Sequence, residues 1–92
     1  MFTNKYVEAI NAVIACLIPA GVPFTVHPIS EGLQIRFPWH EGDVACHAGT
    51  YCSDCGCVES YQFPWDDGDV TVQTPKEMAN DIIRLYQEGA WE

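Results

Sequence analysis

The spacing of hydrophobic residues changes twice along this 92-residue chain, and that change restricts the fold more than any other feature. Near the N-terminus, apolar residues recur every three or four positions, which is typical of an amphipathic helix: Val7, Ile10, Val13, Ile14, Leu17 and Ile18. We therefore predict a helix over residues 4–18. Thr3 is a suitable N-cap, and Pro19 with Gly21 is expected to end the helix.

The C-terminal segment has a clear helix-start signal. Thr74-Pro75-Lys76-Glu77 combines a capping box with proline at the first helical position. Apolar residues then mark one face of a helix: Met78, Ile82, Leu85 and Tyr86. Gly89 follows the last expected turn, so the sequence predicts a helix over residues 75–88.

Between these helices the apolar residues alternate with polar or small ones, which is typical of strands with one buried face. The alternation covers five short runs: Val22, Phe24 and Val26; Leu33, Ile35, Phe37 and Trp39; Val44 and Cys46; Tyr61, Phe63 and Trp65; Val70 and Val72. We predict an α+β fold, a two-layer sandwich. An antiparallel meander sheet of four to five strands carries both helices on one face, in the order α-β-β-β-β-β-α. Residues 1–92 are expected to form a single compact domain.

One eight-residue motif occurs twice, as FPWHEGDV at residues 37–44 and FPWDDGDV at residues 63–70. Each copy predicts a hairpin in which a four-residue loop, 40–43 or 66–69, joins a Trp to a Val on the opposite strand. Gly42 and Gly68 would supply a positive φ in these loops. In a meander both loops lie at the same end of the sheet, about 10 Å apart. Five carboxylates would therefore converge on one rim: Glu41, Asp43, Asp66, Asp67 and Asp69.

Three interpretations of that rim remain open. The acids can be solvated turn residues, or a binding site for basic groups of a partner protein. A calcium site is the third interpretation, although the spacing in DDGD differs from that of an EF-hand loop.

The segment CHAGTYCSDCGC, residues 46–57, contains four cysteines. Cys52 and Cys55 have the spacing of half a zinc site, because two intervening residues let both thiolates reach one metal ion. Cys46 and Cys57, placed on the apolar face by strand alternation, would complete a site of four thiolates. A Cys46–Cys57 disulfide or buried thiols are the alternatives. His47 points away from that face and is the weaker candidate ligand.

The net charge of −9 narrows the classes of function. Such a charge repels nucleic acid and anionic membranes and attracts basic protein surfaces. No segment is long and apolar enough to span a bilayer, so we expect a cytoplasmic protein with reduced thiols. Cys46 and His47 point to opposite faces of a strand, and no phosphate-binding loop is present, so we expect no enzymatic activity.

A small acidic protein-protein interaction module fits these observations best. In its most concrete form it is an inhibitor that occupies the basic, nucleic-acid-binding surface of a protein complex, in the manner of phage anti-CRISPR or anti-restriction proteins. That likeness concerns size and charge. The alternative is a zinc-stabilised structural or adaptor domain that uses the cysteine loop 46–57.

Overall fold

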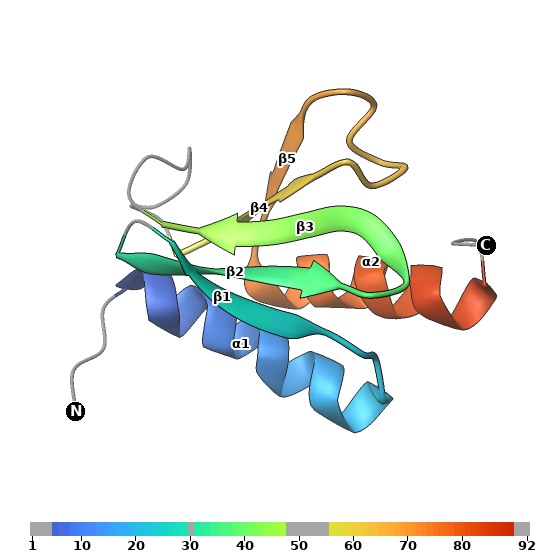
Figure 1. The fold of residues 1–92 in the computed structure, drawn as a ribbon, viewed down its shortest axis with the longest axis horizontal. Coiled ribbons are helices and arrows are strands. Elements are labelled where there is room, and N and C mark those ends of the chain that lie inside the picture. The colour runs from blue at the N-terminus through green and yellow to red at the C-terminus, as the bar shows by residue number, and fades with distance from the viewer. Residues whose placement is uncertain (1–4, 30, 48–55, 90–92) are drawn as a thin grey trace.

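The computed structural model of the chain describes residues 5–29, 31–47 and 56–89. Two helices flank five strands: α1 (Lys5–Ala20), β1 (Thr25–Ile29), β2 (Gly32–Phe37), β3 (His40–Cys46), β4 (Val58–Tyr61), β5 (Val70–Gln73) and α2 (Pro75–Glu88). The strands form one antiparallel sheet in the order β1-β2-β3-β4-β5. Both helices lie side by side against one face of this sheet (Figure 1). The predicted α+β meander sandwich is confirmed.

The ends of α2 match the sequence prediction residue by residue. The Thr74 hydroxyl accepts the Glu77 backbone N–H, the Glu77 carboxylate accepts the Thr74 backbone N–H, and Pro75 is the first helical residue. Gly89 ends the helix at a φ of 69°, where its N–H bonds to the Tyr86 carbonyl. These local contacts satisfy end groups that the helix itself leaves unpaired.

Helix α1 extends two residues beyond the predicted end, with Pro19 inside it. A proline in the last turn removes one helical hydrogen bond but does not stop the turn. The helix instead ends at Gly21, which has a φ of 73° and donates its N–H to the Ile18 carbonyl. The predicted cap, Thr3, lies outside the described residues.

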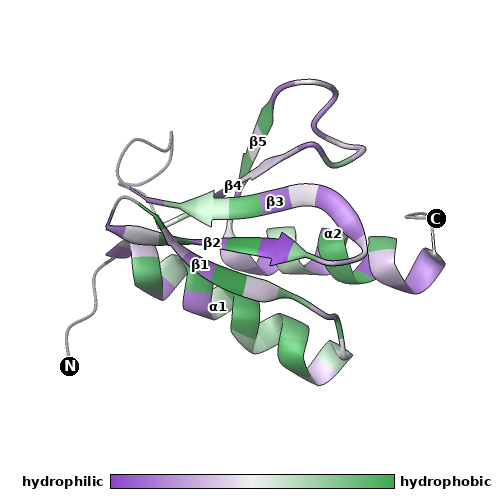
Figure 2. Cartoon of the chain, viewed as in Figure 1, coloured by the Kyte–Doolittle hydropathy of each residue, from purple (hydrophilic) through white to green (hydrophobic). Residues whose placement is uncertain are grey.

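The hydrophobic core lies between the sheet and the helices. Helix α1 packs on β2 and β3, and α2 packs on β4 and β5. The largest fully buried side chains come from both layers: Ile10, Val13, Leu17, Ile35, Val44, Val58, Met78 and Ile82. Figure 2 shows that hydropathy changes along β3, which is hydrophilic where it begins and hydrophobic where it ends. The opposite face of the sheet, which no helix covers, is called the open face below.

The predicted loop 40–43 is wrong, because the chain turns earlier. Phe37 pairs directly with His40, so the two residues of the turn are Pro38 and Trp39. Proline readily starts such a turn because its φ is already fixed. The register then shifts between Arg36 and Phe37, which leaves a β-bulge within β3. Residues 40–43 therefore belong to a strand.

Strands β4 and β5 face the opposite way from the prediction. Val58 and Ser60 are fully buried on the core side, whereas Tyr61 is 45% exposed and Val72 is 40% exposed. Val44 pairs with Ser60, and Ser60 pairs with Thr71, so Thr71 also takes an inward position. Adjacent residues alternate between faces, so this one-residue difference turns Tyr61, Val70 and Val72 to the open face.

Candidate interaction surface

The two copies of the repeated motif pack against each other through their aromatic rings. The Phe63 ring lies between two parallel rings: His40 at 4.9 Å with an interplanar angle of 14°, and Trp65 at 4.7 Å with an angle of 7°. Phe37 meets the edge of the same ring at 5.8 Å. Trp39 contacts both Phe37 and α2, and its Nε1 donates to the Pro23 carbonyl at 2.9 Å. The repeat therefore supplies the two sides of one aromatic cluster, and the two copies do not form two equal hairpins.

Gly42 is required by this packing and not by a turn. Its φ lies outside the left-handed region, and a Cβ atom at this position would lie 2.8 Å from carbon atoms of the Phe63 ring. Gly68, in contrast, has the expected positive φ of 84°. The two equivalent glycines of the repeat thus serve different physical needs.

Asp66 organises the loop of residues 62–69, which joins β4 to β5. Its side chain is 4% exposed. One carboxylate oxygen accepts the Ser60 hydroxyl at 2.8 Å and the other accepts the Phe63 N–H at 2.9 Å. The same hydroxyl accepts Trp65 Nε1–H at 3.1 Å, which holds the indole in place. Asp66 therefore has a structural role. The equivalent position in the other copy of the motif is occupied by His40.

The five predicted rim acids lie in different environments. Glu41 is exposed in β3, and Asp43 is half-buried on the open face. Asp66 is buried, while Asp67 and Asp69 are exposed in loop 62–69. The Asp69 carboxylate accepts the Val70 N–H at 2.8 Å. The meander brings strand and loop together as expected, but the acids do not form a rim of two equivalent turns.

The open face consists of two rows of side chains that cross all five strands. The pairing register defines the first row as Thr25, Arg36, Asp43, Tyr61 and Val70, and the second as His27, Gln34, Ala45, Glu59 and Val72. Both rows change in character along their length. Polar and basic groups lie on β1 and β2, carboxylates lie on β3 and β4, and exposed apolar groups lie at the β4–β5 edge.

Asp43 lies at the centre of this face, next to Arg36 in the register. Burial raises the pKa of the Asp43 carboxyl above its ordinary value of 3.8, and the nearby Asp66 and Glu59 act in the same direction. A hydrogen bond with Gln34 and the charge of Arg36 oppose that rise. Gln34 also accepts Arg36 Nε–H at 3.0 Å. A polar network thus joins Gln34 and Arg36 of β2 to Asp43 of β3.

The charge of the chain is concentrated in its β3–β5 part. Residues 37–75 contain no Lys or Arg and seven acidic residues: Glu41, Asp43, Asp54, Glu59, Asp66, Asp67 and Asp69. All four basic residues lie elsewhere in the sequence: Lys5, Arg36, Lys76 and Arg84. We define the acidic surface as four acids of this part, Asp43, Glu59, Asp67 and Asp69, together with the exposed Tyr61 and Val72, which pair with Asp43 and Glu59 in the two rows.

The structure describes half of the predicted zinc ligands. Cys46 is 1% exposed within the core cluster, and Cys57 is half-buried. Cys57 lies directly before β4, whose first residue, Val58, points into the core. Cys52 and Cys55 lie outside the described residues. Within residues 5–29, 31–47 and 56–89, no group of three or more His, Cys, Asp or Glu side chains is placed to hold a metal ion.

Sequence reasoning missed Ser60, the buried role of Asp66 and the outward position of Val72. The available signal was the pair of acids in PWDDG, because an Asp in a turn often accepts backbone N–H groups.

Comparisons with protein-family models, curated proteins and solved structures found no match. In the part of the chain that the structure describes, neither helix has the length and apolar character needed to cross a membrane.

Proposed function

We propose that this protein is a small acidic interaction module that binds a basic surface of a partner protein through its acidic surface. One observation carries the proposal: a part of the open face combines carboxylates with exposed apolar side chains. No Lys or Arg occurs from residue 37 to residue 75. Complementary charge accelerates association and favours the correct partner. Exposed aromatic and apolar groups supply the area that a contact must bury.

Tyr61 and Val72 are the apolar groups concerned, at 45% and 40% exposure. Asp43 and Glu59 lie beside them in the two rows of the open face, and Asp67 and Asp69 lie in the adjoining loop. In the most concrete form of the proposal, the partner surface normally binds nucleic acid, and the protein inhibits it by occupation. The negative charge of the acidic surface then takes the place of phosphates.

Affinity capture from cells of the source organism tests the proposal when two variants of equal charge are compared. The surface variant is Asp67→Asn/Asp69→Asn, and the control variant is Glu8→Gln/Glu31→Gln, which removes two acids outside the acidic surface. We expect the wild type and the control to retain a common partner that the surface variant loses. Added duplex DNA should displace that partner, because both compete for one basic surface.

Equal retention by both variants would contradict a role for the acidic surface. Equal loss would show that net charge alone governs capture, and would also contradict the proposal. A partner that duplex DNA does not displace would exclude the inhibitor form.

The zinc-stabilised adaptor domain stays a prediction that depends on the cysteine loop. Metal analysis of protein purified in reduced form and without chelator tests it directly. One equivalent of zinc that is lost in Cys52→Ser would support the adaptor function, and zinc-free protein would remove it.

A further inference from the structure

A cavity of about 280 Å³ lies between loop 62–69 and helix α2. Its apolar lining comes from Pro64, Trp65 and Leu85, and its charged lining comes from α2: Asp81, Arg84 and Glu88. Pockets for drug-sized ligands have volumes of roughly 300–1,000 Å³. This cavity is therefore suited to a ligand about as large as one long side chain.

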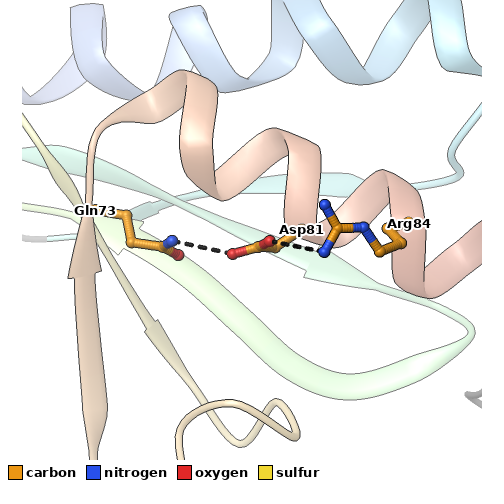
Figure 3. Close-up of polar contacts among 3 residues, drawn as sticks. All are labelled: Gln73, Asp81 and Arg84. Atoms are coloured by element: carbon orange, nitrogen blue, oxygen red, sulfur yellow. Dashed lines mark hydrogen bonds and ion pairs between the residues drawn. The ribbon is translucent and has the colours of Figure 1, made fainter.

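The wall of the cavity is held in position before any ligand binds. The Trp65 indole is stacked on Phe63, and its Nε1–H bonds to the buried Ser60 hydroxyl. On the opposite side, one Asp81 carboxylate oxygen accepts Gln73 Nε2–H at 3.0 Å. Figure 3 shows Asp81 between Gln73, at the end of β5, and Arg84, one helical turn further along α2.

The charged groups favour a cation as the ligand. The lining contains two carboxylates, Asp81 and Glu88, and one cation, Arg84. The Arg84 side chain is 68% exposed, and its Nη1 atom lies 3.9 Å from the Asp81 carboxylate. Such an exposed, distant ion pair contributes little, so Arg84 can move aside. Its position also demonstrates that a guanidinium can reach Asp81.

We infer that this cavity binds an arginine side chain of the basic partner. The aliphatic part of arginine would pack on the apolar lining, as long charged side chains commonly do. Its guanidinium would bind the carboxylates and the indole, since planar guanidinium pairs with carboxylates and stacks on aromatic rings. The inference rests on the proposed function in taking the arginine from a partner protein, but the cavity itself can be tested without one.

The test is a titration of isotope-labelled protein with N-acetyl-arginine amide, followed by amide shifts in NMR spectra. N-acetyl-norleucine amide serves as the uncharged control ligand. We expect saturable shifts at Trp65, Arg84 and Glu88 with the arginine compound, and weaker binding of the norleucine compound. Shifts confined to the exposed acids of loop 62–69, or equal binding of both compounds, would overturn the inference.

Two substitutions on the exposed rim of the cavity should act in opposite directions. Glu88→Gln should weaken binding of the arginine compound about two- to fivefold, the range of an exposed ion pair. Arg84→Gln should strengthen it, because the competing cation is gone. The matched controls are Glu8→Gln and Lys76→Gln, which make the same charge changes away from the cavity and should leave the affinity unchanged.

Equal effects in the control variants would mean that overall charge sets the affinity, and would overturn the site. The two proposals can fail separately. Absence of binding in the titration removes the arginine site and leaves partner capture by the acidic surface intact. Failure of the wild type to capture a partner, together with a normal titration, would instead remove the proposed function.

Discussion

The buried carboxylate of Asp66 gives the sharpest stability prediction. Asp66→Asn keeps the size of the side chain but leaves one acceptor oxygen for two donors, the Ser60 hydroxyl and the Phe63 N–H. Both Asp66 and Ser60 are buried, at 4% and 0% exposure, so water cannot replace the lost acceptor. A hydrogen bond to a charged group is worth about 1.5–3 kcal/mol. We expect the free energy of unfolding to fall by about that amount.

The neighbouring residue supplies a matched control. Asp67→Asn removes the same charge from the same loop, but Asp67 is exposed. Its φ of 49° is one that asparagine tolerates, so the substitution adds no backbone strain. Both substitutions remove one charge from a chain of net charge −9. Asp66 also repels the half-buried Asp43, so its loss relieves more repulsion, and the difference between the variants is a lower limit on the contribution of the buried hydrogen bonds.

Urea unfolding followed by circular dichroism measures this difference in the free energy of unfolding, and thermal unfolding gives the corresponding change in Tm. For a domain of this size, 1 kcal/mol shifts the Tm by about 4–8 °C, so Asp66→Asn should lower the Tm by roughly 6–24 °C relative to Asp67→Asn. An Asp66→Asn protein as stable as the control would refute the structural role of Asp66 and the loop geometry that depends on it.

Three further predictions concern the aromatic cluster and the open face. Gly42→Ala should lower the free energy of unfolding by about 1–3 kcal/mol through overpacking against Phe63, and should cost less in a Phe63→Leu background. Strict additivity would contradict this contact. The raised pKa of Asp43 means that the folded state binds more protons than the unfolded state between pH 3.8 and that raised pKa, so the ionised carboxylate is destabilising at neutral pH. Asp43→Asn should therefore raise the free energy of unfolding at pH 7 more than the exposed Glu41→Gln does, and the gain should shrink below about pH 4. The free energy of unfolding of Asp43→Asn, measured from pH 3 to pH 8, checks this sign. A value at pH 7 below that of the wild type would contradict the prediction. Tyr61→Ala should weaken partner binding about tenfold in calorimetry, and an unchanged affinity would remove Tyr61 from the interface.

The elements that could be predicted from the sequence are those whose signals are local. The capping box at Thr74 and the glycine at position 89 define α2 through contacts within a few residues. The meander order also follows from the tendency of strands that are consecutive in the sequence to pair. These features depend little on distant parts of the chain.

The repeat was misleading because its two copies have different partners. Phe37 and Phe63 occupy equivalent positions in the motif, but the first ends β2 and the second lies in loop 62–69. The loop forms because Asp66 reaches Ser60, a residue outside the motif. In β4, Ser60 points inward and Tyr61 outward, so a polar hydroxyl needed by a buried carboxylate decides the facing of the strand. Hydrophobic alternation alone cannot reveal that requirement.

The candidate site could be predicted from the sequence only in part, because its geometry also depends on contacts outside any local pattern. The excess of acids between residues 37 and 75 can be read directly from the sequence. Which acids are exposed depends on the bulge in β3 and on loop 62–69, and these two segments pack together through contacts between distant residues, such as the stacking of His40 on Phe63. The cavity beside Trp65 likewise requires the loop and α2 to meet, and no local pattern encodes that meeting.

Hydrogen–deuterium exchange of the protein, alone and bound to the captured partner, tests the acidic surface most directly. Bound protein should exchange more slowly at the backbone amides of β4, β5 and loop 62–69, with α1 unchanged. Slower exchange over α1 with β4, β5 and the loop unchanged would contradict the assignment of partner binding to this part of the molecule.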